Sequence, residues 1–232
     1  MAIAPLLTEQ QLQLLRQFST CIVANAIEKF NVRLRNTGFT NGSIHCRFRD
    51  APPMVGYAVT ARLRSEDPPI AGKMFRDRTD FWNAVLTIPA PRVLVLKDMD
   101  DPPGRGAFVG DVHAAILKAL GCVGFVTNGA VRELPGVKES DFQLFSGSLA
   151  VSHAYAHIFD VGCKVVVGGM DVCPGDLLHG DQHGVLTIPS EIAAEVSGEA
   201  ADLEAQEKKV IEFCRSGEFS VAKLSEITRS IR

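Results

Sequence analysis

Two short segments near the middle of the chain combine residue types that bind small anions and metal ions. The first runs from Gly104 to His113 and reads GRGAFVGDVH, so a glycine-rich loop leads directly into a predicted helix. The first amides of a helix have no partner within it, and the helix dipole makes that end mildly positive. This end is therefore a candidate site for a carboxylate or a phosphate. The alternative is an ordinary loop in which Asp111 caps the helix.

The spacing of this first segment excludes two nucleotide-binding motifs. It is not followed by the Gly-Lys-[Ser/Thr] of a Walker loop, and it lacks the G-x-G-x-x-G order of dinucleotide-binding folds. The carboxylate of Asp111 would also repel a highly charged anion. A small carboxylate beside a cation therefore fits the segment better than a triphosphate does.

The second segment, TNGAVRE, follows a predicted buried strand and ends in Arg132 and Glu133. A guanidinium offers a planar fork to carboxylate or enolate oxygens. A neighbouring carboxylate can hold a hard cation such as Mg²⁺, with water and substrate oxygens completing the shell. The alternative is that both side chains are ordinary surface groups in solvent.

Two other groups of residues could form a metal site or supply a general base. Cys173, His179, Asp181 and His183 could suggest zinc, but C-x5-H-x3-H is not a zinc-finger spacing, and the glycines among them indicate tight turns. A turn-forming scaffold that presents His179 or Asp181 to a neighbouring subunit is the favoured interpretation. His153 could act as a general base or be a structural histidine. The chain has no G-x-S-x-G elbow, so the sequence does not support serine hydrolysis.

The elements around the first two segments form a predicted βαβ unit. Arg92–Lys97 and Cys122–Thr127 are short apolar runs typical of buried strands, and Asp111–Leu120 between them is helical. Ligands of such units gather beyond the carboxyl ends of the strands. Those ends are the loops Asp98–Gly110 and Asn128–Val137, which carry the candidate residues.

The remaining pattern predicts an α/β fold, with a mixed sheet, a central βαβ unit and helices at both ends, as one domain over residues 1–232. A capping box at Thr8–Gln11 opens a helix predicted over residues 9–30, and Ser190 is expected to cap a long helix over 191–215. Ser65–Asp80 is predicted as a loop. The other expected elements are strands at 54–64, 142–145, 149–152, 164–167 (with a continuation to 172) and 184–188, and helices near 80–87 and 220–230.

Composition bounds the class of protein. The 232 residues are 46% hydrophobic and 22% charged, which excludes a disordered or fibrous chain. A formal net charge of −3 gives no electrostatic case for nucleic acid or an anionic membrane. Six cysteines without a C-x-x-C pair are expected to be reduced thiols packed in a core, and no secretory signal is seen. We expect a cytoplasmic protein.

Two motifs in this order resemble a known family. G-D-x-H-x-x-x-x-x-A-L-G-C-x-G-x-V-T-N-G-x-V-R-E, followed by P-G-D-L-L-H-G-D-Q-H-G-V-L-T-I-P, is similar to the regulator of ribonuclease activity A-like (RraA-like) superfamily. That superfamily includes class II 4-hydroxy-4-methyl-2-oxoglutarate/4-carboxy-4-hydroxy-2-oxoadipate aldolases. The resemblance covers about Val93 to Pro189 and is less distinctive before it.

The resemblance implies a swivelling β/β/α-type fold assembled as a homotrimer or a dimer of trimers, with active sites between subunits. It implies cleavage of a pyruvate-containing aldol, with oxaloacetate decarboxylation as a related activity. The family's carboxylate-binding loop maps onto Gly110, Asp111, Val112 and His113, and its substrate-binding arginine maps onto Arg132. Its metal-binding aspartate falls at Glu133, a departure that keeps the carboxylate and so keeps Mg²⁺ or Mn²⁺ as the expected cofactor.

Three functions follow as hypotheses. The first is a metal-dependent lyase acting on a small 2-keto acid, in which Arg132 and the cation stabilise charge developing on the keto oxygen. The second is a non-enzymatic regulator of ribonuclease activity that binds a protein. The third is an enzyme acting on another small acid such as a sugar acid. The residues leave the general base of an aldol cleavage open, whereas a decarboxylation needs none.

Overall fold

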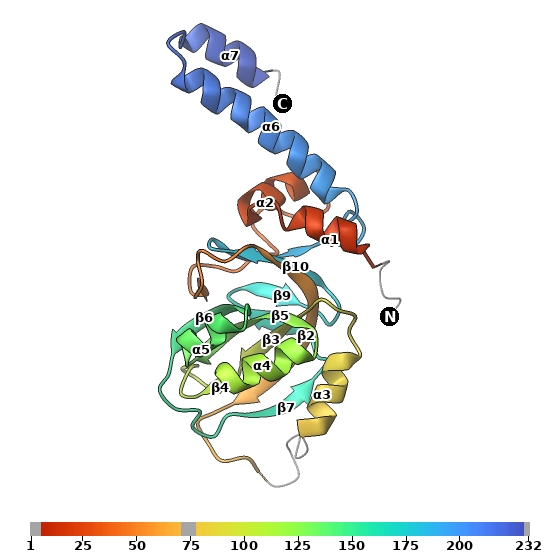
Figure 1. Cartoon of the computed structure of the whole chain (residues 1–232), viewed down its shortest axis with the longest axis vertical. Coiled ribbons are helices and arrows are strands. Elements are labelled where there is room, and N and C mark those ends of the chain that lie inside the picture. Colours follow the sequence, from red (N-terminus) through yellow and green to blue (C-terminus); the bar gives the residue numbers. More distant parts are fainter. Residues whose placement is uncertain (1–5, 71–77, 230–232) are drawn as a thin grey trace.

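A mixed sheet forms the centre of the molecule. The computed structural model describes residues 6–70 and 78–229, so part of the predicted Ser65–Asp80 loop lies outside the described residues. Within them the sheet has nine strands, and Figure 1 shows helices on its face and at one end. Its main path runs β1 (His45–Cys46), β6 (Gln143–Leu149), β5 (Cys122–Val131), β3 (Arg92–Asp98), β2 (Met54–Arg64), β10 (Leu177–Asp181) and β11 (Gly184–Ile188).

The predicted βαβ unit is confirmed. β3 and β5 are adjacent and parallel, and α4 (Asp111–Ala119) lies between them in the chain. A short strand that the sequence did not predict, β4 (Ala107–Val109), forms inside the expected Asp98–Gly110 loop and pairs in parallel with the far end of β5. The predicted end of β5 at Thr127 is wrong, because pairing with β4 and β6 continues the strand to Val131.

The central strands are largely apolar, as is typical of a sheet that is covered on both faces. Alternate residues of β3 enter different cores: Leu94 and Leu96 pack on one side, and Val93 and Val95 pack on the other. The first side is covered by α3 (Arg78–Leu86), α4 and α5 (Leu134–Glu139). The second is covered by the hairpin of β8 (Val165–Val167) and β9 (Met170–Val172).

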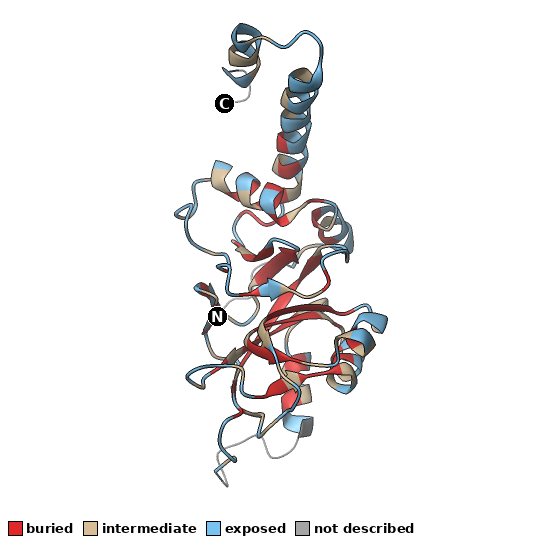
Figure 2. Ribbon diagram, turned by 90° about the vertical axis from the view of Figure 1, so that its left-hand side faces the viewer, coloured by how far each residue is buried: buried red, intermediate tan, exposed pale blue. Residues whose placement is uncertain are grey.

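A third core joins both ends of the chain to one end of the sheet. α1 (Glu9–Leu15) and α2 (Thr20–Lys29) pack with the start of α6 (Val196–Arg215) against β2, β10 and β11. Beyond its first turns α6 is largely exposed, and it runs away from the body with α7 (Val221–Arg229) folded beside it (Figures 1 and 2).

Several predicted bounds are corrected by local side-chain chemistry. The helix expected over residues 9–30 is two helices, because Ser19 is extended and its hydroxyl caps α2 at the Ile22 amide. The capping box at Thr8 is confirmed. The long C-terminal helix begins at Val196, not after Ser190, and turns occupy the residues between. A Gly168–Gly169 turn divides the predicted 164–172 strand into β8 and β9.

Other differences concern strands and cysteines. The expected strand over 149–152 does not form, since β6 already runs from Gln143 to Leu149. β7 (His157–Val161), which pairs antiparallel with β2, and β10 were not predicted. All six cysteines are free thiols, but the expectation that they pack in a core is wrong for Cys21 and Cys214, which are exposed. Burial raises the pKa of the Cys122 thiol to about 12.

Candidate active site

The predicted site residues meet at one cavity beyond the ends of the parallel strands. The cavity has a volume of about 490 Å³ and is lined by Gly110, Val112, His113, Arg132 and Glu133. Asp111 is not in its wall, but its backbone amide contacts Glu133. The structure thus brings together two segments that are about twenty residues apart in the chain. The rest of the wall comes from the loop before α3, from α3, from β4, and from the segment that leads into β7 together with the start of β7: Pro69, Phe81, Trp82, Ala107, Phe108, His153, Ala154, Tyr155, Ala156, His157 and Ile158.

Arg132 and Glu133 form a half-exposed ion pair directly after the C-terminal end of β5. An Nη2 of Arg132 lies 2.7 Å from Oε1 of Glu133. The backbone amide of Arg132 donates to the carbonyl of Val109 in β4. This strand, which the sequence did not predict, therefore fixes the backbone position from which the Arg132 side chain extends. Glu133 follows with a left-handed backbone, φ 54° and ψ 40°, which turns the chain sharply into α5. Such a conformation is uncommon for a residue with a side chain.

The start of α4 is already capped by carboxylates. The Asp111 amide donates to Oε2 of Glu133 over 3.3 Å, and the Val112 amide donates to the carboxylate of Asp111 over 2.6 Å. Negative groups at a helix N-terminus are stabilised by its dipole. The amides expected to receive a substrate carboxylate are therefore oriented toward anions, and acidic side chains of the chain itself occupy two of them.

Gly110 is the residue that lets Glu133 reach the helix. A Cβ at this position would lie 2.2 Å from Oε2 of Glu133 and 3.2 Å from Cγ of Arg132. The absence of a side chain therefore allows the ion pair to sit directly over the first turn of α4. The backbone of Gly110 is extended, so the requirement here is space and not an unusual dihedral angle.

Two acids that sequence reasoning missed, buried Asp98 and partly buried Asp100, anchor the loop that precedes β4. The carboxylate of Asp98, 1% exposed, accepts hydrogen bonds from the amides of Gly104 at 2.7 Å and Asp100 at 3.1 Å. Burial raises the pKa of Asp98 even though these amides oppose the shift. The amide and hydroxyl of Ser65 both donate to Asp100, and the Gly106 amide donates back to that hydroxyl. The sequence signal for Asp98 was its position directly after the predicted buried strand Arg92–Lys97.

A second missed element is the segment before β7, which closes one side of the cavity. The carbonyl of Val151 accepts a hydrogen bond from Nη1 of Arg132 at 3.4 Å. His153 follows two residues later, is exposed and lines the cavity. Aromatic rings also line the cavity, and the ring of Phe108 lies 4.8 Å from that of His113 and 6.0 Å from that of Phe81.

Among the described residues of the cavity wall, Glu133 supplies the carboxylate and is the candidate metal ligand. No group of three or more His, Cys, Asp or Glu side chains is placed to hold a metal within residues 6–70 and 78–229. Mg²⁺ is commonly bound through one or two carboxylates, with waters and substrate oxygens in the remaining positions. Oε1 of Glu133 pairs with Arg132 and Oε2 accepts from the Asp111 amide, and each oxygen retains a second lone pair. Glu133 therefore fits a cation of this kind.

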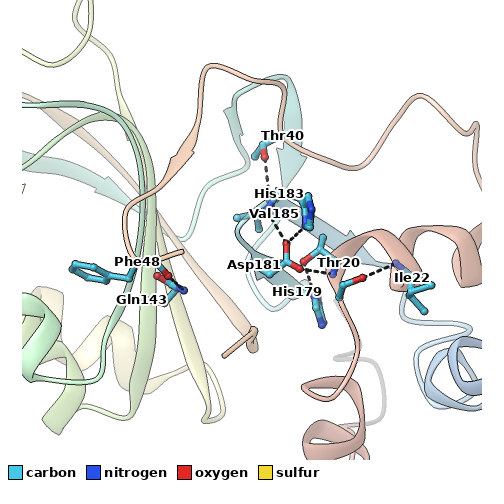
Figure 3. Close-up of polar contacts among 10 residues, drawn as sticks. Thr20, Ile22, Thr40, Phe48, Gln143, His179, Asp181, His183 and Val185 are labelled. Carbon is cyan, nitrogen blue, oxygen red and sulfur yellow. Dashed lines mark hydrogen bonds and ion pairs between the residues drawn. The ribbon is translucent and has the colours of Figure 1, made fainter. Parts of the chain in front are cut away.

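The His179–His183 segment belongs elsewhere, and its predicted presentation to a neighbouring subunit is wrong for His179. The imidazole is fully buried. Its Nδ1 lies 2.9 Å from the Thr20 hydroxyl (Figure 3). Its Nε2 lies 3.1 Å from the carbonyl of Leu15. Asp181 accepts from the Thr20 amide and from His183. This network joins β10 to the start of α2, so it secures the N-terminal helices.

Comparisons with known proteins place the chain in one family. A family model described as RraA-like (Aldolase/RraA) matches residues 20–187. A protein of Halalkalibacterium halodurans named "Putative 4-hydroxy-4-methyl-2-oxoglutarate aldolase" is 31% identical over 109 residues, which cover 45% of this chain and 52% of that protein. The match thus spans about half the length of this relative.

Solved structures share the fold. An uncharacterized protein from Pseudomonas syringae pv. tomato is similar with a TM-score of 0.76 and 22% identity, over 99% of this chain and 97% of that one. Streptomyces coelicolor RraAS2, described as an unusual member of the RNase ES inhibitor RraA protein family, is similar with a TM-score of 0.66 and 21% identity, over 88% and 96%. The predicted α/β fold class is confirmed. No helix within 6–70 and 78–229 is long and apolar enough to cross a membrane.

Proposed function

The chain belongs to the RraA-like family, and we propose that it is a divalent-metal-dependent lyase that cleaves a C–C bond of a small 2-keto acid to give pyruvate. The named substrates we propose are 4-hydroxy-4-methyl-2-oxoglutarate for aldol cleavage and oxaloacetate for decarboxylation. One observation carries the proposal: Arg132, Glu133 and the N-terminus of α4 meet at a single cavity. We also propose a homotrimer or a dimer of trimers.

The start of α4 would hold the carboxylate of the keto acid. In the structure, carboxylates of Glu133 and Asp111 occupy the Asp111 and Val112 amides. A substrate carboxylate is chemically the same kind of acceptor, so it can replace them without changing the donors. This exchange would release Glu133 from the helix and leave its oxygens available to a cation.

Arg132 would stabilise the transition state. When the C–C bond breaks, its electron pair moves into the pyruvate fragment, and negative charge develops on the keto oxygen. A guanidinium placed beside that oxygen is worth more in the transition state than in the ground state, because the charge grows during the reaction. The bond from Arg132 to the Val151 carbonyl holds the guanidinium at the cavity.

Glu133 would hold Mg²⁺ or Mn²⁺. When bound, such a cation supplies Lewis-acid polarisation of the keto group and needs no lysine Schiff base. The residues of the chain then position the substrate: α4 holds one end, and Arg132 faces the oxygen that gains charge. The methylene that distinguishes Glu133 from the family's aspartate lets its carboxylate fold back over Gly110, where a side chain would collide.

The test is pyruvate release from each substrate with Mg²⁺, measured by a coupled lactate dehydrogenase assay. Turnover that stops with EDTA and returns with excess Mg²⁺ is the expected result. An exposed residue far from the cavity, Lys208→Ala, is the control and should leave turnover unchanged. Absence of turnover on both keto acids, together with a stoichiometric complex with a ribonuclease, would reject the lyase in favour of the binding regulator.

A further inference from the structure

In each of two histidines of the cavity wall, Nδ1 is hydrogen-bonded to a backbone carbonyl, which fixes the tautomer of the neutral ring. Nδ1 of His153 lies 2.7 Å from the carbonyl of Ala154, and Nδ1 of His157 lies 2.7 Å from the carbonyl of Tyr155. A carbonyl oxygen can only accept a hydrogen bond, so Nδ1 carries the hydrogen in each neutral ring. The lone pair is then on Nε2, which is the nitrogen able to take a proton.

The Nε2 of His153 is available for that task. Among the described residues it has no hydrogen-bond partner, and the side chain is exposed and lines the same cavity as Arg132 and Glu133. The contrast with His179 is direct, because both nitrogens of that ring are bonded inside the protein. A histidine with one nitrogen fixed and the other open has the form of a general base.

The backbone holds the His153 segment in place. The carbonyl of Ser152 accepts from the Ala107 amide of β4, and the Tyr155 amide donates to the carbonyl of Ser65. Gly106 permits this approach, since a Cβ there would lie 2.4 Å from the carbonyl oxygen of His153. The ring is therefore carried by a segment tied to β4 on one side and to the Ser65 loop on the other.

The segment also connects His153 to the guanidinium. Arg132 donates to the carbonyl of Val151, two residues before His153. His157 is further along the chain, at the start of β7, where its backbone pairs with Arg64 of β2. Of the two fixed histidines, His153 is thus the one whose segment is bonded to Arg132.

We propose that Nε2 of His153 is the general base of the aldol cleavage, an inference that rests on the proposed lyase function. Nε2 takes the proton of the substrate's C4 hydroxyl as the C3–C4 bond breaks. The oxygen electron pair forms the new carbonyl of the leaving fragment, and the C–C electrons pass to the pyruvate fragment. The resulting enolate is then protonated at C3 by the imidazolium, which restores the neutral imidazole as the base. Decarboxylation of oxaloacetate has no hydroxyl proton to remove and does not use this step.

The test compares two reactions in two matched variants. His153→Asn keeps an N–H for the Ala154 carbonyl and removes the basic nitrogen, and His157→Asn makes the same change at the other histidine. Both are assayed with 4-hydroxy-4-methyl-2-oxoglutarate and with oxaloacetate. We expect His153→Asn to lower the cleavage kcat by roughly 10²–10⁴, the usual contribution of a general base, and to lower the ratio of cleavage to decarboxylation at least about 10-fold.

The outcomes distinguish a wrong assignment of the base from a wrong assignment of the lyase function. Equal losses in both reactions would make His153 structural and overturn the assignment, as would an unchanged cleavage rate. A selective loss in His157→Asn instead would move the base to His157 and equally overturn it. If the wild-type protein converts neither substrate, the lyase function itself fails and the base assignment fails with it.

Discussion

The molecule contains two groups of polar residues that look alike in the sequence and differ completely in the fold. The candidate site, with Asp111, His113, Arg132, Glu133 and His153, lies around an open cavity. The network of Thr20, His179, Asp181 and His183 joins two elements (Figure 3). The imidazole of His179 within it is buried. The difference teaches that histidine and carboxylate chemistry is decided by which atoms the fold leaves unbonded.

The first variant, Arg132→Ala, tests whether the cavity residues carry the chemistry. We expect kcat/KM for pyruvate release to fall by roughly 10²–10³, on the order of 3–4 kcal/mol, because an oxyanion donor is lost. Steady-state kinetics on oxaloacetate measures it. The free energy of unfolding should change little, since the pair with Glu133 is half exposed. A variant with wild-type turnover would remove Arg132 from the mechanism.

The second is His179→Ala, which should affect stability and not chemistry. It leaves a cavity and deprives the Thr20 hydroxyl and the Leu15 carbonyl of their partner, so we expect a loss of about 2–4 kcal/mol in the free energy of unfolding. Urea titration measures the loss. His183→Ala is the matched control, because its half-exposed ring should contribute less than about 1 kcal/mol. Equal effects of the two variants would contradict the buried network.

The third, Gly106→Ala, sharpens the assignment of the His153 segment. The added Cβ would collide with the carbonyl of His153, so the segment must shift. We expect aldol cleavage to slow by roughly 10-fold, because small displacements of a catalytic group reduce rates by such factors. Oxaloacetate decarboxylation should slow less. If the two reactions slowed by the same factor in this variant, the position of the segment would have no specific effect on the base.

The smallest expected effect is a pH dependence of stability that depends on His179. Burial lowers the pKa of this imidazole, so the folded protein favours its neutral form. The unfolded chain takes up the proton first, near its ordinary pKa of about 6.5. The stabilising contribution is full above that pH and is lost as the pH falls toward the folded pKa, by at most about 1.4 kcal/mol per pH unit. Unfolding free energies at about pH 8 and about pH 5.5 should differ less in His179→Ala than in the wild type.

Local sequence pattern was a good guide wherever a single element decides the structure. The capping box at Thr8, the apolar runs of β3 and β5 and the helix at Asp111 follow from propensity, capping and periodicity, which act within a few residues. The same local rules missed β4, which is only three residues long, and β10, which contains His179, Gly180 and Asp181. Both become strands because a neighbouring strand supplies their hydrogen bonds. Pairing partners far along the chain leave no local trace.

The residues by themselves determined that Gly110–His113 and Arg132–Glu133 would stand at the ends of adjacent parallel strands, because a βαβ unit places those ends at one edge of a sheet. Only the tertiary structure decided that Glu133 folds over Gly110 onto the helix start, that His153 joins the same cavity, and that His179 is sealed inside. Each depends on contacts between segments distant in sequence, and it is packing that determines which polar atoms keep a partner and which remain free to react.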